Sequence, residues 1–134
     1  MSREILFRAK RNDWRELPKE EWWIEGLPCY GLPGKITEIE HWEDFVYCKV
    51  DEIDPETLCQ YTGLTDKNGK RIWENDIIRD IEMGYQSVFW DSDIASFALD
   101  DGKFENSFGD FCADECEVVG NIFDNPELLD QESR

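Results

Sequence analysis

The residues best suited to covalent chemistry in this chain are a single histidine, His41, and five cysteines. Nucleophilic catalysis needs a nucleophile, a base beside it and a group that orients the base. His41 stands next to Trp42 in an acidic stretch, and the sequence around it does not supply these partners. We therefore favour a surface or structural histidine. A small hydrolase is the less favoured alternative, and it predicts His41 within hydrogen-bond reach of a Cys or Ser in a pocket.

No part of the sequence has the residue spacing of a well-defined metal site. Cys112 and Cys116 have a loose ligand spacing, but they lack a second pair, and His41 alone does not complete a zinc site. Several acidic pairs offer hard oxygen ligands to Ca²⁺ or Mg²⁺, but none has the spacing of an EF-hand loop. These pairs are Asp91 and Asp93, Asp100 and Asp101, and Asp114 and Glu115. We interpret them as solvated turn residues, so the sequence predicts neither a metal site nor a cofactor.

Five polar and aromatic residues are candidates for an interaction surface. Trp22 and Trp23 are adjacent, and two neighbours in one strand point to opposite faces. One of them is therefore a candidate for an exposed aromatic anchor, unless a neighbouring loop covers it. Gln60 and Thr62 either face a binding surface or help to form a sharp bend, and we favour the bend because Gly follows Thr62. Asn68, in the next turn, completes the set.

The charge of the chain excludes one broad class of partner. The sequence has 32 acidic residues and 14 Lys and Arg, for a net charge of −18. Residues 36–60 carry −7 of this and residues 81–134 carry −12, whereas residues 1–35 carry +1. Such a chain repels a phosphate backbone, so we expect no direct binding of nucleic acid. A basic protein is a suitable partner, and a second possibility is that the acids imitate nucleic acid.

Short strands must position these residues, because apolar and polar residues alternate over many short runs. The clearest runs are 3–9, 45–50, 58–61, 77–82, 87–90, 94–99 and 117–123. Residues 21–25 are favoured as a strand over a helical turn that opens at Pro18. Residues 26–34 contain two Pro and three Gly and are therefore predicted as a loop. Residues 104–111 are predicted to be irregular.

The sum of these elements is a mainly β fold, or α+β at most, made of short antiparallel strands. The part from Asn75 onward, with a breaker pair, a strand, a hairpin and a closing strand, is similar in pattern to a small SH3-like barrel. That pattern transfers no ligand, because such barrels serve many functions. Pro126, with Asn125 before it and Glu127 after it, predicts a short C-terminal helix.

The length of the chain and its cysteines indicate the number of domains and the cellular compartment. A chain of 134 residues is expected to form one domain, with an alternative division into residues 1–57 and 58–134. No apolar run reaches the roughly 18 residues of a membrane span. An odd number of scattered cysteines is typical of a reducing compartment, so we expect a cytoplasmic protein. Self-association is left open, because unpaired strand edges favour it and net charge opposes it.

The segment from Leu58 to Ile78 has the clearest local structure. It reads as a strand, a turn at Asp66–Gly69, a short return strand, a second turn at Asn75 and Asp76, and a third strand. This segment resembles the central signature of the YopX-like family, whose members carry a stretch of the form QYTGLKDKNGKEIYEGDIV. Residues 3–9 and 118–129 also resemble the two ends of that family. Asn75 replaces the usual Gly, and it also tolerates a left-handed backbone.

The resemblance implies a small protein encoded by a phage or prophage, without a settled biochemical activity. Together with the aromatic residues and the acidic blocks, it leads us to expect a non-catalytic interaction module in the host bacterial cell that binds a host or phage protein. The alternatives are the acidic mimic of nucleic acid, which would inhibit a DNA- or RNA-binding enzyme, and the small hydrolase. Binding that weakens steeply in salt favours the mimic, whereas a salt-tolerant apolar interface favours the module.

Overall fold

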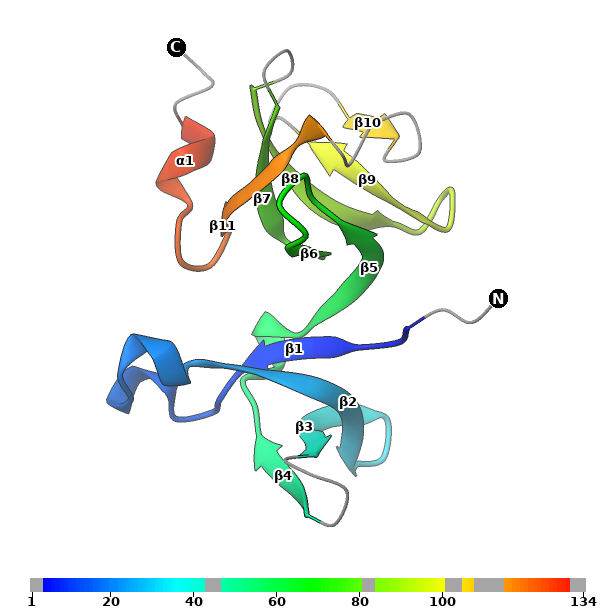
Figure 1. The fold of residues 1–134 in the computed structure, drawn as a ribbon. Coiled ribbons are helices and arrows are strands. Elements are labelled where there is room, and N and C mark those ends of the chain that lie inside the picture. The colour runs from blue at the N-terminus through cyan, green and yellow to red at the C-terminus, as the bar shows by residue number, and fades with distance from the viewer. Residues whose placement is uncertain (1–3, 43–46, 81–83, 101–104, 108–114, 131–134) are drawn as a thin grey trace. The chain divides into compact units, whose positions relative to one another are not determined.

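The described part of the protein consists mostly of antiparallel strands, as expected, with one short α-helix near its C-terminus (Figure 1). The computed structural model describes residues 4–42, 47–80, 84–100, 105–107 and 115–130. The chain forms two compact units, Met1–Tyr61 and Thr62–Arg134. The number of independently folding domains stays a prediction. None of the helices in the described ranges is long and apolar enough to cross a membrane.

The first unit contains four complete strands, three short 3-10 helices and the start of a fifth strand. The strands are β1 (Phe7–Lys10), β2 (Trp23–Leu32), β3 (Lys35–Trp42), β4 (Cys48–Glu52) and the beginning of β5 (Cys59–Thr65). The 3-10 helices are η1 (Trp14–Glu16), η2 (Lys19–Glu21) and η3 (Pro55–Thr57). Consecutive strands from β1 to β4 pair in order, and β1 also pairs with β5.

An isolated bridge between Arg11 and Ile53 joins the end of β1 to the residue after β4. The pairings from β1 to β4 therefore close into a ring. Ala9, Ile24, Ile39 and Ile53 form the core of this ring, each at most 6% exposed. Their burial follows the period-two alternation of the strands, which places every second side chain on the inner face.

The prediction of a loop at residues 26–34 is wrong for residues 26–32, because β2 continues to Leu32, and only Pro33 and Gly34 form a turn. Gly26 is required by packing, since a Cβ there would collide with the backbone of Glu40. Pro28 is tolerated because the pairing of β2 with β1 ends at Gly26, which leaves that edge of β2 without a β1 partner at Pro28. Register shifts around Tyr30 absorb the remaining irregularity. The prediction of a strand at residues 21–25 is partly confirmed, because η2 ends at Glu21 and β2 begins at Trp23.

The second unit contains the end of β5, the short strand β6 and a five-stranded sheet. Its strands are β6 (Arg71–Trp73), β7 (Asp76–Asp80), β8 (Gly84–Asp91), β9 (Ser96–Asp100), β10 (Glu105–Ser107) and β11 (Glu117–Asn121), followed by α1 (Glu127–Asp130). The sheet has the order β10-β9-β8-β7-β11. The predicted hairpin of β8 and β9 and the short C-terminal helix are confirmed. β10 lies inside residues 104–111, which were predicted to be irregular, so that prediction is wrong for residues 105–107. The rest of that stretch lies outside the described residues.

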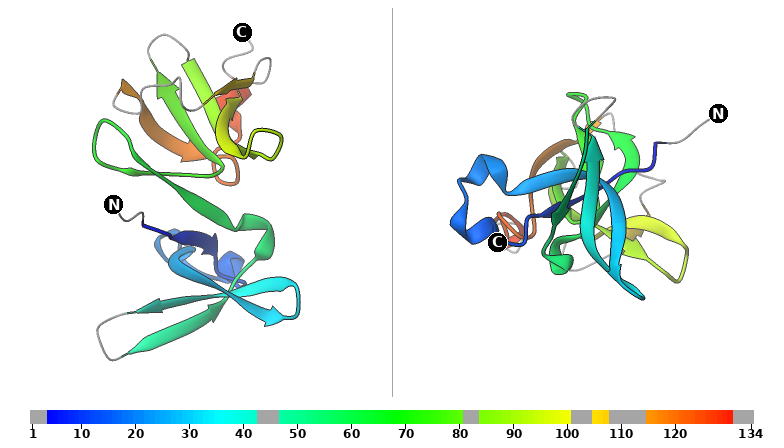
Figure 2. Two further views of the ribbon diagram at one scale, coloured as in Figure 1. Left: turned by 90° about the vertical axis from the view of Figure 1, so that its right-hand side faces the viewer. Right: turned by 90° about the horizontal axis from the view of Figure 1, so that it is seen from below.

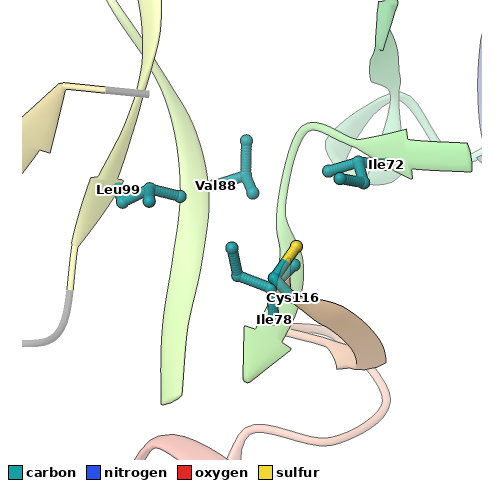
Figure 3. Close-up of a cluster of buried hydrophobic side chains, with 5 residues drawn as sticks. All are labelled: Ile72, Ile78, Val88, Leu99 and Cys116. Carbon is teal, nitrogen blue, oxygen red and sulfur yellow. The ribbon is translucent and has the colours of Figure 1, made fainter. Parts of the chain in front are cut away.

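The core of the second unit consists of Ile72, Ile78, Val88, Leu99 and Cys116, all 0% exposed. Figure 3 shows these five side chains converging from β6 to β9 and from the residue before β11. The two end strands of the sheet, β10 and β11, do not pair with each other in the described part of the chain. The expected SH3-like barrel is therefore corrected to an open sheet.

Candidate functional site

β2, β3 and β4 are neighbours in the sheet of the first unit, and Figure 2 draws them in blue to green. Residues directly opposite in an antiparallel pair have side chains on the same face. The register aligns Leu27 with Glu40 and Val50, Cys29 with Glu38 and Glu52, and Trp42 with Cys48. Because Ile39 faces the core between Glu38 and Glu40, these side chains lie on the opposite side. We call the following set the outer face: Leu27, Cys29, Glu38, Glu40, Trp42, Cys48, Val50 and Glu52.

Three of the outer-face residues are large apolar side chains in contact with water. Leu27 is 47% exposed, Trp42 59% and Val50 51%. Leu27 and Val50 stand on either side of Glu40 in one row across the sheet, and Trp42 belongs to the next row of this face. The outer face carries three carboxylates, and none of its eight residues is Lys or Arg. The face is therefore both apolar and anionic.

Two thiols on the outer face share one carboxylate. The Sγ of Cys48 donates to Oε1 of Glu40 at 3.0 Å, and the Sγ of Cys29 donates to Oε2 of the same residue at 3.9 Å. The hydrogen bond to Glu40 raises the pKa of Cys48 to about 11, with smaller contributions from desolvation and from the charge of Glu40. Burial and the neighbouring glutamates also raise the pKa of Cys29. Both thiols therefore stay protonated at neutral pH, and only the thiolate is a strong nucleophile or metal ligand.

His41 lies on the other face of β3 and contacts an acid. Its Nε2 is 2.7 Å from Oδ2 of Asp51, which also accepts from Nη1 of Arg11 at 2.9 Å. Burial acts to raise the pKa of Asp51, but the hydrogen bonds from His41 and Arg11 outweigh it, so the pKa is lowered. In the described part of the chain, Asp51 is the side-chain hydrogen-bond partner of His41. The hydrolase hypothesis required Cys or Ser in that place.

The residues singled out as metal ligands do not form a cluster where the structure describes them. Within the described ranges, no three His, Cys, Asp or Glu side chains are arranged to hold a metal ion. Cys116 is buried in the second core, and Asp91 accepts the backbone N–H of Asp93 at 3.0 Å, as expected of a turn residue. Three members of the sequence-based pairs lie outside the described residues, namely Asp101, Cys112 and Asp114.

Comparison with known proteins then identifies the family. The family described as YopX protein matches residues 6–130, nearly the whole chain. The chain belongs to the YopX family. No curated protein matches it. The crystal structure of protein EF1440 from Enterococcus faecalis is similar to this YopX-family chain, with a TM-score of 0.58 and 22% sequence identity. The match covers 96% of this chain and 99% of that one, and at this identity it supports the fold alone.

Trp22 and Trp23 of this YopX-family protein are both half-buried and both lie near one cation. The Nζ of Lys10 is 3.8 Å from the ring centroid of Trp14, 4.5 Å from that of Trp22 and 5.7 Å from that of Trp23. Lys10 is only 2% exposed. Both tryptophans approach the same side chain because Trp22 precedes β2, so strand alternation does not separate them. Their role in binding a partner stays a prediction.

The other three sequence-based candidates have local structural contacts. Thr62 donates its hydroxyl to the carbonyl oxygen of Ile72 at 2.7 Å, consistent with a bend at Gly63, whose φ is 90°. The backbone N–H of Asn68 donates to Asp66 in the predicted turn. Gln60 is half-buried and pairs with β1. Trp22, Trp23 and Gln60 belong to the first unit, whereas Thr62 and Asn68 belong to the second.

The outer face was missed by sequence analysis because its three strands were not identified together. Leu27 and Cys29 fall in the stretch that was predicted as a loop. The available signal was the alternation of Glu38, Glu40 and Trp42 around the buried Ile39, which places two acids and an aromatic residue on one side of β3.

Proposed function

We propose that this YopX-family protein is a non-catalytic interaction module of phage or prophage origin. It acts in the cytoplasm of the host bacterium and binds a host or phage protein through the outer face. The observation that carries the proposal is the exposure of Leu27, Trp42 and Val50 on one open surface of the sheet. A few residues that lose water on binding, tryptophan prominent among them, supply most of the energy of a protein interface.

The outer face also specifies the chemistry of the partner. Burying Glu38, Glu40 and Glu52 against an apolar surface would cost several kcal/mol unless cations meet them. The partner therefore presents Lys or Arg around a central apolar group. In this arrangement Trp42 supplies affinity, and the carboxylates select the partner and its orientation.

The acidic mimic of nucleic acid is the second candidate, and one arrangement favours it. Glu38 and Glu40 are two residues apart on β3, which separates them by about 6.7 Å. Glu52 lies directly opposite Glu38, so the three carboxylates make a small anionic cluster on two neighbouring strands. This function needs only the charges, whereas the interaction module needs the apolar residues as well.

An affinity capture with two variants tests the proposal. The full chain serves as bait in host and phage lysates, together with Trp42→Ser and the control Ile94→Ser, which removes an apolar residue of similar exposure (54%) in the second unit. We expect a protein that is retained by the wild type and by Ile94→Ser, and lost with Trp42→Ser. Retention of this protein when salt rises from about 0.1 M to about 0.5 M supports the module, because screening weakens exposed charge pairs and leaves apolar contacts.

Two outcomes would contradict the module. Capture that is unchanged by Trp42→Ser excludes the exposed aromatic residue of the outer face as the source of the binding energy. Capture that is unaffected by Trp42→Ser but lost in salt and in Glu38→Gln/Glu40→Gln favours the mimic. Calorimetric titration of the captured protein, once purified, with the same variants then confirms which residues provide the binding energy.

A further inference from the structure

The carboxylate of Glu40, on the outer face, is held in position by two groups that carry no charge. The Sγ of Cys48 donates to its Oε1 at 3.0 Å, and the Sγ of Cys29 donates to its Oε2 at 3.9 Å. Cys48 belongs to β4 and Cys29 to β2, so the carboxylate is bonded from the strands on both sides of β3. A protonated thiol is a weak, neutral donor, so these bonds orient Glu40 and leave its negative charge uncompensated.

No cation of the described chain balances Glu40. The outer face contains no Lys or Arg, and none of the ion pairs among the described residues includes Glu40. Glu38 lies two residues away on the same face and adds further negative charge. Covering such a carboxylate with an apolar surface alone would leave a charge buried without a partner, which is strongly unfavourable. The compensating cation must therefore come from the bound protein.

We propose that Glu40 and Trp42 together bind one arginine side chain of the partner protein. The inference rests on the proposed function, because it names a residue of the protein that the outer face binds. A carboxylate has about four acceptor sites, two on each oxygen. Each oxygen of Glu40 uses one of them for a thiol. Two parallel N–H groups of a guanidinium can therefore bond both oxygens at once.

Trp42 lies where its ring can cover the guanidinium. It follows Glu40 by two residues on the same face of β3, a separation of about 6.7 Å along the strand. It also stands directly opposite Cys48, whose Sγ contacts the Glu40 carboxylate. The ring is exposed, and a guanidinium stacks on an aromatic face. The carbon stem of the arginine can pack on Leu27 or Val50, which flank Glu40 in its row.

Arginine fits this arrangement better than lysine does. The ammonium group of lysine is a compact and strongly hydrated point charge, whereas the guanidinium is planar, weakly hydrated and forked. The fork matches a carboxylate whose two oxygens are both held in place by neighbours. The plane matches the exposed ring of Trp42. The outer face should therefore distinguish arginine from lysine, although both carry one positive charge.

An NMR titration of the full chain with short peptides tests the inference. The probes are acetyl-Leu-Arg-Leu-amide and two analogues in which lysine or citrulline replaces arginine. Lysine keeps the charge without the planar fork, and citrulline keeps the plane without the charge. We expect the arginine peptide to bind about tenfold more tightly than either analogue. Glu40→Gln should remove this difference, and Glu56→Gln, an exposed glutamate of the same unit outside the outer face, should keep it.

The bound guanidinium should also change the titration of Cys48. The hydrogen bond to Glu40 is the main reason that the pKa of Cys48 is raised to about 11. A cation that bonds Glu40 competes with the thiol and favours the thiolate, so the pKa should fall toward 9.0. The Cβ chemical shift of Cys48, followed against pH with and without the arginine peptide, measures the change. If Glu40 had only a structural role, the peptide would leave this pKa unaltered.

Three results would overturn the inference: equal affinity for the three peptides, an arginine preference that survives in folded Glu40→Gln, or no binding of the arginine peptide at millimolar concentration. None of them affects the interaction module, because capture through Trp42 does not require an arginine. An arginine preference that depends on Glu40, found when no protein is captured through Trp42, would support this inference and contradict the module. The two proposals can therefore fail separately.

Discussion

The carboxylate of Asp66 accepts the backbone N–H of Val118 at 2.9 Å, although the two residues are 52 positions apart. The other oxygen of Asp66 accepts the N–H groups of Asn68 and Lys70, each at 2.9 Å. Asp66 is 4% exposed. One buried side chain therefore holds the turn of the family signature and attaches that turn to β11. The carbonyl oxygen of Cys116 adds a further bond, from the N–H of Lys67 at 3.0 Å.

Replacing this carboxylate should destabilise the second unit. Asp66→Asn keeps the size of the side chain but places an amide group where an acceptor is needed. We expect the free energy of unfolding to fall by about 2–3 kcal/mol, as for a buried hydrogen bond to a charged group. Urea unfolding followed by circular dichroism measures the change. Asp93→Asn, in an exposed turn, is the control and should change the free energy by less than about 0.5 kcal/mol. A loss in Asp66→Asn no larger than the control would contradict the role of Asp66.

The same carboxylate predicts a dependence on pH. Burial acts to raise the pKa of Asp66, but the backbone donors Val118, Lys70 and Asn68 outweigh it and lower the pKa from 3.8. A lowered pKa contributes stability that is fully present above 3.8 and is lost as the pH falls through the folded value. We therefore expect the stability difference between wild type and Asp66→Asn to be constant near neutral pH and to shrink below the unfolded pKa. A difference that grows on acidification would refute this assignment.

Gln86 offers a stabilising substitution. Its side chain is 0% exposed, and neither Nε2 nor Oε1 has a hydrogen-bond partner among the residues that the structure describes. It lies opposite Ile78 on the face that carries Val88, within the apolar core. Gln86→Met keeps the length and removes the buried amide, so we expect the free energy of unfolding to rise by about 1–3 kcal/mol. Thermal unfolding measures the gain, with the half-buried Gln60→Met as a control. A lower melting temperature in Gln86→Met would show that the amide has a necessary contact.

Lys10 should stabilise the first unit through its tryptophan neighbours. Its ammonium group lies 3.8 Å from the ring centroid of Trp14 and 4.5 Å from that of Trp22. Lys10→Met keeps an unbranched apolar stem and removes the charge. We expect a loss of about 1–2 kcal/mol and a change in tryptophan emission, because a cation–π contact is strongest where water is excluded. The exposed Lys35→Met should change neither quantity. Unaltered emission and stability in Lys10→Met would contradict the contact.

Glu40 should control the reactivity of Cys48. The pKa of Cys48 is about 11, so this exposed thiol should react slowly with iodoacetamide at pH 8. Glu40→Gln removes the carboxylate that favours the protonated thiol, so we expect the pKa to fall toward 9.0 and the rate to rise by tenfold or more. Peptide mapping by mass spectrometry at several pH values measures the rate at Cys48. Glu38→Gln is the control, because no hydrogen bond joins Glu38 to this thiol among the contacts of the described residues. Equal rates in wild type and Glu40→Gln would disprove the coupling.

Local sequence determined the family, the mainly β class, the turn at Asp66–Gly69, the left-handed Asn75 with its φ of 72° and the short C-terminal helix. Each of these features depends on residues close together in the sequence, so a few consecutive residues are enough to predict it. Tertiary structure decided the features that depend on contacts between residues far apart in the sequence. β2 continues through one proline and two glycines because β3 pairs with it up to Leu32. Asp66 meets Val118, and Glu40 gathers two thiols, only after strands far apart in sequence come together. The outer face likewise exists only once the register of β2, β3 and β4 is set, and no local pattern fixes that register.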